Sequence, residues 1–260
     1  MIQLKFAMHL SIRPVKIDIL LCLLLIFVSS CSKNYPDITP LSIQRGECVF
    51  QGIDKNQKRC EFIYSVPKNY KPQQSMPLLI ALHGSGDNML AFFDLFKPVT
   101  DSTGYVLLAV QGLRRYDSGF CWSWDKNGEI SILTCLDIIR QQVHIDQNRI
   151  FILGFSSGGK MAYRIVTAHA IIFKGLALLS APLSGEDIVD SPWHLGHMRV
   201  FIGRGDHEQK YITETQTLVT ILIKYCEKVK YRIYANTGHS LPDPKEKAIQ
   251  EILDFFLSSP

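Results

Sequence analysis

Short apolar runs alternate with helical patterns from residue 59 onward, and this alternation constrains the fold more than any other feature of the chain. The run Pro77–Leu82 contains no polar residue, as expected for a strand buried on both faces of a parallel sheet. The other strand patterns lie at 60–66, 105–110, 149–153, 175–179, 199–202 and 230–234, and helical patterns lie at about 131–144, 157–169, 211–227 and 244–257. The order predicts an α/β fold with a mainly parallel central sheet and helices on both of its faces.

The composition is that of a globular protein. Of the 260 residues, 47% are hydrophobic and 20% are charged, so one domain with a full core is expected at residues 46–260. The net charge of +4 is too small to indicate a nucleic-acid-binding surface, and we expect no nucleic-acid partner.

The N-terminus has the pattern of a targeting segment. Residues 1–30 begin with scattered basic residues and continue into the apolar run Ile19–Val28, which is too short to span a bilayer and predicts a signal peptide. The sequence Val-Ser-Ser-Cys that ends at Cys31 resembles a bacterial lipobox, in which this cysteine is acylated. Residues 31–45 then form a tether.

We expect an exported protein held at the cell envelope by this lipid alone, more readily at the outer than the inner membrane because Ser32 follows the cysteine. Without acylation, the protein would be secreted.

Four cysteines of the exported part are disulfide candidates, because export brings thiols to an oxidising compartment. Cys48 and Cys60 flank a turn-like segment at 52–56 and could face each other across a hairpin. Cys121 and Cys135 could close a second loop. The chain shows no zinc-ligand pattern, and we expect neither a metal nor a cofactor.

A nucleophile motif follows the strand pattern at 149–153. The segment Gly154–Gly159 reads Gly-Phe-Ser-Ser-Gly-Gly and leads into a helical pattern. Small residues permit the sharp turn that lifts a serine hydroxyl to the edge of a sheet, which makes Ser156 the predicted nucleophile. A glycine-rich turn without chemistry is the alternative.

A second glycine-rich loop, His83-Gly84-Ser85-Gly86, follows the strand pattern at 77–82. Such a loop can direct a backbone N–H group at the reacting carbonyl oxygen. We predict an oxyanion hole made by the N–H groups of Ser85 and Ser157. His83 is expected to order the loop rather than take part in catalysis.

A serine nucleophile requires a base, and the base requires a carboxylate that orients it. Asp206 and His239 each follow a predicted strand, in the order serine, acid, histidine. The predicted catalytic residues are therefore Ser156, Asp206 and His239. Asp187 and Asp190 are alternative acids, because they follow the preceding strand pattern.

Several further segments carry recognisable motifs, at 83–88, 111–113, 121–124, 146–150, 154–164 and 238–242. Together they resemble the polyhydroxybutyrate depolymerase and feruloyl-esterase-like group of α/β-hydrolases. The resemblance implies the α/β-hydrolase fold, ester hydrolysis and catalytic roles for Ser156, Asp206 and His239. The stretch before the acid departs from the family pattern, because Ile202 stands where the family usually has histidine.

The resemblance also suggests that Trp122 and Trp124 line the substrate pocket, although both could equally be core aromatics. Residues 180–198 leave no room for a large helical lid. We therefore predict a serine esterase that forms an acyl-enzyme on polyester, feruloyl or acetyl-sugar esters. A peptidase or acyltransferase on the same fold, or an inactive binding lipoprotein, are the alternatives, and the oligomeric state is left open.

Overall fold

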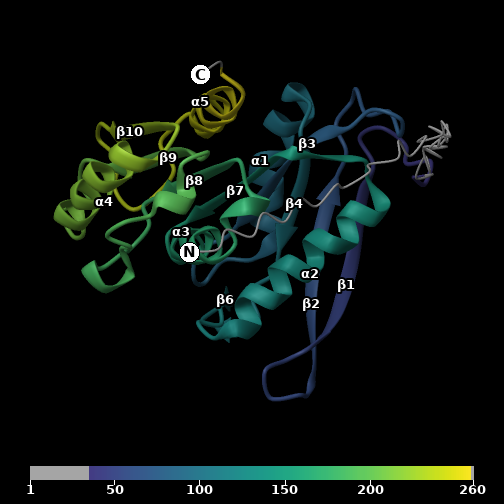
Figure 1. The fold of residues 1–260 in the computed structure, drawn as a ribbon. Coiled ribbons are helices and arrows are strands. Elements are labelled where there is room, and N and C mark those ends of the chain that lie inside the picture. The colour runs from purple at the N-terminus through teal and green to yellow at the C-terminus, as the bar shows by residue number, and fades with distance from the viewer. Residues whose placement is uncertain (1–34, 259–260) are drawn as a thin grey trace, which may run out of the picture. The chain divides into compact units, whose positions relative to one another are not determined.

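An eight-stranded sheet forms the centre of residues 35–258, the part of the chain that the computed structural model describes (Figure 1). Its strand order is β1-β2-β4-β3-β7-β8-β9-β10. The strands are β1 Ile43–Gln51, β2 Gln57–Ser65, β3 Met76–Leu82, β4 Val106–Val110, β7 Ile145–Phe155, β8 Gly175–Leu179, β9 Arg199–Gly205 and β10 Lys228–Tyr234. Strands β3, β4, β7, β8, β9 and β10 run parallel, whereas β1 and β2 form an antiparallel hairpin that joins β4. The predicted mainly parallel sheet is confirmed.

The register aligns the carboxyl ends of the central strands. Leu82 of β3 pairs with Val110 of β4 and with Gly154 of β7. All seven residues of β3 are buried, which explains why its sequence lacks the alternation of a half-exposed strand. Polar segments that follow these strands are thereby brought to one edge of the sheet.

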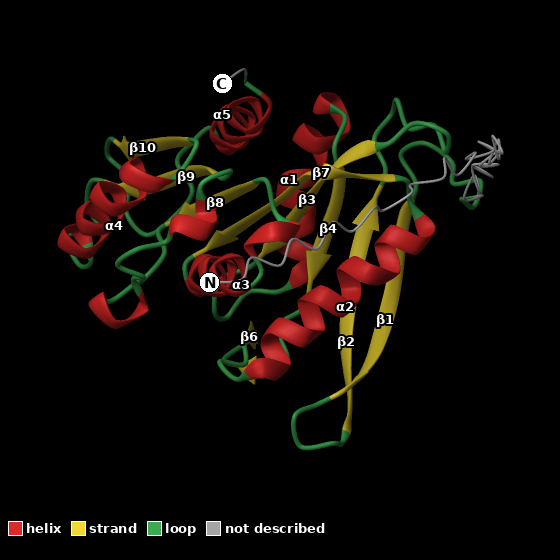
Figure 2. Ribbon diagram, in the orientation of Figure 1, coloured by secondary structure: helices red, strands yellow, loops and turns green. Residues whose placement is uncertain are grey.

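Helices cover both faces of this sheet, as Figure 2 shows. They are α1 Met89–Thr103, α2 Lys126–Gln142, α3 Ser157–Ala168, α4 Ile212–Tyr225 and α5 Lys245–Leu257. Buried side chains of α1 and α5 share one hydrophobic core, and those of α2, α3 and α4 contribute to a second core on the opposite face. This is the three-layered α/β architecture that the sequence predicts.

Smaller elements connect the main ones. A two-stranded sheet is formed by β5 Arg114–Tyr116 and β6 Gly119–Cys121. The short 3₁₀ helices are η1 Ala170–Ile172, η2 Gly185–Asp187 and η3 Trp193–Leu195. Between β8 and β9 the chain forms only η2 and η3, so no large helical lid is present there.

Helix α1 is an element that the sequence patterns do not reveal. The Asn88 side chain accepts hydrogen bonds from two backbone N–H groups of its first turn. Gly104, at a φ of 84°, ends the helix in the left-handed conformation that glycine adopts most readily. Pro98 lies inside the helix, which makes the segment a poor match to a regular helical pattern.

The N-terminal hairpin has the expected register, because Cys48 of β1 lies directly opposite Cys60 of β2. Strand β1 begins at Ile43, inside the stretch expected to be tether. The predicted signal peptide at 1–30 and the acylation site at Cys31 lie outside the described residues. Within residues 35–258, no helix is long and apolar enough to cross a membrane.

The cysteines do not pair as expected. The five cysteines in the described part of the chain are free thiols, and the Cys135 Sγ lies 3.4 Å from the Cys48 Sγ. Cys60 belongs to the same cluster, whereas Cys121 of β6 lies outside it. The expected pairing of Cys121 with Cys135 is therefore wrong, because α2 directs Cys135 at the N-terminal hairpin.

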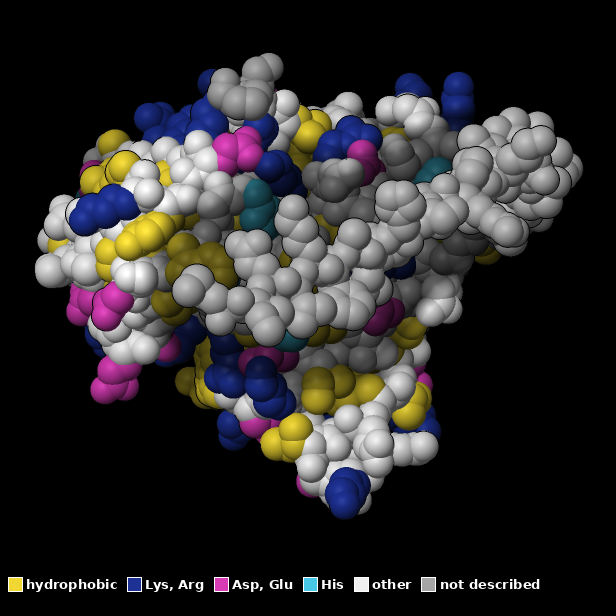
Figure 3. All heavy atoms as spheres, viewed as in Figure 1, with side chains coloured by type: hydrophobic (Ala, Val, Ile, Leu, Met, Phe, Trp, Pro, Cys, Tyr) yellow, Lys and Arg dark blue, Asp and Glu magenta, His cyan; other side chains and the backbone are white. Residues whose placement is uncertain are grey.

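Charged side chains of both signs are interspersed over the face shown in Figure 3, with hydrophobic side chains between them. The large apolar residues lie mainly in the two cores. Burial of this surface is the main stabilising contribution to a fold of this kind.

Candidate active site

A sharp turn between β7 and α3 presents the Ser156 side chain at the carboxyl edge of the sheet. Ser156 adopts φ 51° and ψ −123°, and its N–H donates to the Leu179 carbonyl of β8 at 2.8 Å. A Cβ on Gly154 would lie 2.2 Å from the Gly158 carbonyl carbon, and one on Gly158 would lie 2.2 Å from the Leu82 oxygen. The two glycines of the motif are thus required by close backbone packing, and the half-buried serine is held in a strained conformation.

His239 lies beside this serine, 83 residues further along the chain. Its Nε2 is 2.9 Å from the Ser156 Oγ, within hydrogen-bond distance. The histidine follows β10 in a loop, and its ring packs against that of Phe155 with centroids 5.1 Å apart. The sequence motifs predict that these two residues act together, and the structure places them within hydrogen-bond distance.

The carboxylate next to His239 is Glu208, not Asp206. The His239 Nδ1 lies 2.5 Å from the Glu208 Oε1. Asp206 instead accepts hydrogen bonds from the backbone N–H groups of Asn236 and Thr237, each at 3.0 Å. The prediction that Asp206 holds the His239 ring is therefore wrong, because its side chain turns toward the loop backbone.

Glu208 is held from several sides. Its Oε2 accepts hydrogen bonds from the Ser180 hydroxyl at 2.6 Å and from the Gly205 N–H at 3.0 Å. Burial raises the pKa of Glu208, but hydrogen bonds from His239, Ser180 and Gly205 outweigh burial and leave this pKa below its usual value. The carboxylate therefore stays ionised and can stabilise a protonated imidazole.

Arg204 supports the same carboxylate from inside the protein. Its side chain is buried, and its Nη1 lies 3.7 Å from the Glu208 Oε1. The guanidinium also donates to the Ala181 carbonyl at 2.7 Å and to the Lys210 carbonyl at 3.1 Å. Arg204 thus links the loop that carries Glu208 to the loop that follows β8.

Of the alternative acids, Asp187 is already paired. Its carboxylate accepts hydrogen bonds from Lys160 at 2.8 Å and from the Ser184 backbone at 2.8 Å. Burial raises the pKa of Asp187, but hydrogen bonds from these groups together outweigh burial and leave this pKa below its usual value. This residue stabilises the start of η2 and does not contact His239.

The loop after β3 lies against the start of α3, where an oxyanion hole is expected. The Ser85 hydroxyl donates to the Ser157 hydroxyl at 2.9 Å, which ties the two segments together. Within residues 35–258, neither backbone N–H of these two serines donates to another group. Both N–H groups therefore remain available to a ligand oxygen.

The buried His83 side chain fixes the conformation of this loop, as expected. Its ring is fully buried, and its Nε2 accepts a hydrogen bond from the Gly112 N–H at 3.0 Å. Its Nδ1 lies 2.7 Å from the Gly84 carbonyl oxygen, which requires the proton to sit on Nδ1. Burial lowers the pKa of His83, so the ring is held neutral.

A cavity of about 550 Å³ opens directly over the Ser156 and His239 side chains. Its walls come from the loops that follow β7, β8, β9 and β10. The lining residues are Ser156, Ser180, Pro182, Arg204, His207, Glu208, Gln209, Lys210, Tyr211 and His239.

Neither tryptophan suggested for the pocket lines this cavity. Trp122 is fully buried, and its indole N–H donates to the His83 carbonyl at 2.8 Å, so it is a core residue. Trp124 lines a separate hollow of about 210 Å³ beside Lys160 and Tyr163. The suggested substrate-binding role of both residues is therefore not supported by their positions, and the loop at 207–211 supplies pocket residues that the sequence motifs missed.

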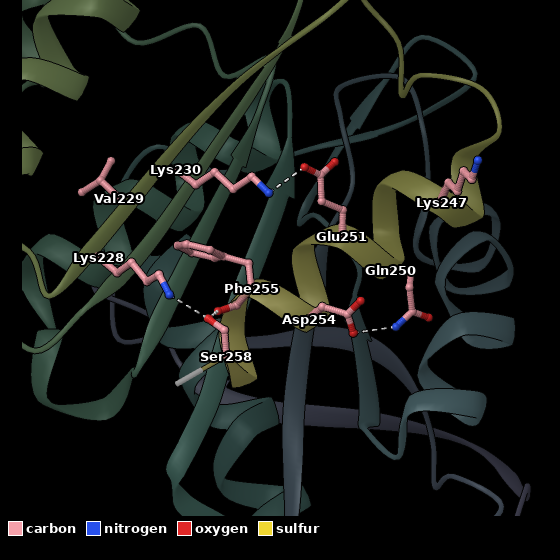
Figure 4. Close-up of a pocket in the computed structure, with 9 residues that line it drawn as sticks. All are labelled: Lys228, Val229, Lys230, Lys247, Gln250, Glu251, Asp254, Phe255 and Ser258. Carbon is pink, nitrogen blue, oxygen red and sulfur yellow. Dashed lines mark hydrogen bonds and ion pairs between the residues drawn. The ribbon is translucent and has the colours of Figure 1, made fainter. Parts of the chain in front are cut away.

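A larger cavity of about 680 Å³ lies elsewhere, between β10 and α5 (Figure 4). Lys230 pairs there with Glu251 at 2.7 Å, and Lys228 donates to the Ser258 hydroxyl at 3.1 Å. No histidine is among its described lining residues. It therefore lacks a serine–histidine pair such as the one formed by Ser156 and His239, and the cavity over Ser156 is the candidate active site.

The sequence profile of the phospholipase/carboxylesterase family matches residues 127–257, which is half of the chain. The chain is 31% identical over 141 residues to feruloyl esterase C of Emericella nidulans, covering 51% of this chain and 50% of that protein. It is 27% identical over 143 residues to poly(3-hydroxybutyrate) depolymerase of Ralstonia pickettii, covering 48% and 29%. The chain thus spans half or less of the length of these curated relatives. The expected resemblance to both groups is confirmed.

Solved structures show the same fold. A carboxylesterase from Mesorhizobium loti superposes with a TM-score of 0.57 at 21% identity, over 69% of this chain and 89% of that one. A ferulic acid esterase superposes with a TM-score of 0.63 at 14% identity, over 83% and 98%. At these identities the likeness concerns the fold alone, and it confirms the predicted α/β-hydrolase architecture.

Proposed function

The chain belongs to the phospholipase/carboxylesterase family, and from this we propose that it is a serine esterase acting through Ser156, His239 and Glu208. One observation carries the proposal: the Ser156 Oγ, the His239 ring and the Glu208 carboxylate form a continuous hydrogen-bonded line, with distances of 2.9 and 2.5 Å. Nucleophile, base and orienting acid need this arrangement for acyl transfer.

The reaction has two steps. His239 takes the hydroxyl proton of Ser156 while the serine oxygen attacks the ester carbonyl, and the Glu208 carboxylate stabilises the imidazolium that forms. The backbone N–H groups of Ser85 and Ser157 stabilise the negative oxygen of the tetrahedral intermediate. His239 then gives its proton to the leaving alcohol. A water molecule releases the acid by the same route in reverse.

The names of the relatives and the open cavity support a proposal for the substrate class. The curated relatives are named for feruloyl esters and for poly(3-hydroxybutyrate). The cavity over Ser156 has no helical lid among the described residues. We infer that the enzyme acts on feruloyl, polyester or acetyl-sugar esters whose remainder extends out of the site.

Export and lipid attachment at Cys31 remain part of the proposal. The basic lead, the apolar run and the lipobox-like motif at residues 1–31 support them. Incorporation of labelled palmitate into the full chain, abolished in Cys31→Ser, would support attachment. Equal labelling of both chains would contradict it.

Hydrolysis of short p-nitrophenyl esters tests the esterase proposal. We expect activity in the wild-type chain and a loss of about 10⁴-fold or more in Ser156→Ala, because the nucleophile is removed. A fluorophosphonate should add covalently to Ser156 in the wild type only, as peptide mass spectrometry would show. A folded wild-type chain that is inert to both reagents would overturn the proposal.

A further inference from the structure

Three cysteine thiols meet in the core, away from the catalytic residues. Cys48 comes from β1, Cys60 from β2 and Cys135 from α2, and their sulfur atoms all lie within 4.8 Å of one another. All three side chains are buried. The cluster sits where α2 packs on the N-terminal hairpin (Figure 1).

The Sγ atoms of Cys48 and Cys135 lie 3.4 Å apart, within hydrogen-bond distance for two thiols. Cys60 is engaged elsewhere, since its thiol donates to the Gln111 carbonyl at 3.2 Å. Cys48 lies against α2 at a second point as well, since its Sγ is 3.9 Å from the Ser131 carbonyl oxygen. Cys48 and Cys135 thus make a direct thiol–thiol contact that joins β1 to α2.

We propose that Cys48 and Cys135 form a disulfide that fastens the N-terminal hairpin to α2, with Cys60 remaining a thiol beside it. A disulfide needs sulfur atoms about 2.05 Å apart, so the two Sγ atoms must approach each other from the observed 3.4 Å. A metal held by the three thiolates is less favoured. Two thiolates on one tetrahedral zinc ion lie about 3.8 Å apart, and the described cluster offers no fourth side-chain ligand.

The bond forms by thiol–disulfide exchange with a small or protein disulfide as the oxidant. The Cys48 thiolate attacks one sulfur of the donor and releases the other as a thiol. Deprotonated Cys135 then attacks the Cys48 sulfur of this mixed disulfide and releases the second donor thiol. Two electrons and the two thiol protons pass to the donor. Because the folded protein buries the cluster, the exchange belongs to folding rather than to the native state.

Peptide mapping tests the pairing. The full chain is refolded from denaturant in reduced and oxidised glutathione, its remaining thiols are alkylated, and it is cleaved with trypsin. The three cysteines fall in separate tryptic peptides, 46–55, 60–68 and 127–140. We expect 46–55 to be linked to 127–140. A link between 46–55 and 60–68, full alkylation of all three, or stoichiometric zinc in the native protein would each overturn the proposal.

Cysteine variants give a second readout. Cys60→Ala should keep the linked peptide pair, and so should the control Cys226→Ala, which lies outside the cluster. In Cys135→Ala the pair disappears, and oxidation should no longer raise the melting temperature by the roughly 5–15 °C expected for a bond across a long loop. If Cys135→Ala fails to fold, the mapping of the wild type and Cys60→Ala still decides the pairing. Loss of the link in Cys60→Ala would contradict it.

Discussion

Single residues decide which carboxylate serves the active-site histidine. Asp206 and Glu208 both follow β9, two positions apart, but their side chains turn in different directions. Asp206 binds the backbone of the loop that carries His239, and hydrogen bonds from Thr237 and then Asn236 lower its pKa. Glu208 contacts the imidazole itself. Asp206 is therefore a positioning residue in our proposal, and Glu208 is the catalytic acid.

Replacement of Glu208 tests this division. In Glu208→Gln we expect kcat for ester hydrolysis to fall by about 10³–10⁴-fold, because a neutral amide neither fixes the imidazole tautomer nor stabilises its charge. Initial-rate kinetics with a p-nitrophenyl ester measure the effect. The melting temperature of each variant shows that the comparison is made between folded proteins.

Asp206→Asn is the matched control. It retains an acceptor for the loop backbone, so we expect kcat within roughly tenfold of the wild type. If Asp206→Asn lost as much activity as Glu208→Gln, the assignment of the acid would be wrong.

The sequence leads to Ser156 and His239 because both stand in motifs at strand ends, whereas the acid has no motif of its own. Asp206 directly follows the glycine that ends β9, and chain order alone cannot tell it from Glu208. The difference lies in side-chain direction after the turn, which depends on Ser180 and on the loop at 236–237. Burial of Trp122 depends in the same way on packing between distant segments.

At the scale of elements, the strand–turn–helix around Ser156 depends on backbone contact with β3. Gly158 lies at the start of α3 against the end of β3, and no side chain fits between them. The site therefore requires two neighbouring strands and a helix to pack closely.

Gly158→Ala tests this contact. The added Cβ would meet the Leu82 oxygen at 2.2 Å, so backbone must shift, and we expect a loss of about 1–3 kcal/mol in the free energy of unfolding together with most of the activity. Gly185→Ala is the control, because nothing lies within 4 Å of its Cβ position. Urea unfolding measures both variants. Equal stability of the two variants would show that the turn between β7 and α3 tolerates a side chain at position 158.

Elements with regular patterns could be predicted, and those defined by local exceptions could not. Strands β3, β7 and β8 contain apolar runs that predict a strand from the sequence alone, and the apolar residues of α5 recur at helical spacing. Helix α1 carries Pro98, whose missing N–H breaks the usual pattern, and it is stabilised instead by the buried aromatic side chains on its inner face. Such compensation is visible only when the neighbouring strands are in place.

For the whole molecule, buried and partly buried carboxylates link stability to pH. Burial raises the pKa of Glu129. The hydrogen bonds and positive charges of Lys126 and Arg164 lower this pKa by a larger amount, so the net shift is downward. Glu208 is shifted in the same direction. The native protein therefore binds fewer protons than the unfolded chain at acid pH, and this part of the stability is present above the unfolded pKa of about 4.3.

We expect the free energy of unfolding to fall as pH drops below about 4.3 and through the lower native pKa values of these groups. Urea unfolding at pH 6, 4 and 3 measures the change. Glu129→Gln should show a shallower fall, because the group that binds the extra proton on unfolding has been removed. An identical pH dependence in the wild type and this variant would contradict the prediction.

Strand β10 is the last strand of the sheet, and it carries several basic residues. Lys228, Lys230 and Arg232 alternate along it, and a partner at Glu251 holds two of them in place. An uncovered strand edge can recruit an extended segment of another molecule and begin an aggregate. Cationic side chains repel a second copy of the same edge, and desolvating them would be costly. We therefore expect these basic residues, of which Lys228 and Lys230 border the cavity in Figure 4, to disfavour pairing of β10 with the same strand of a second copy.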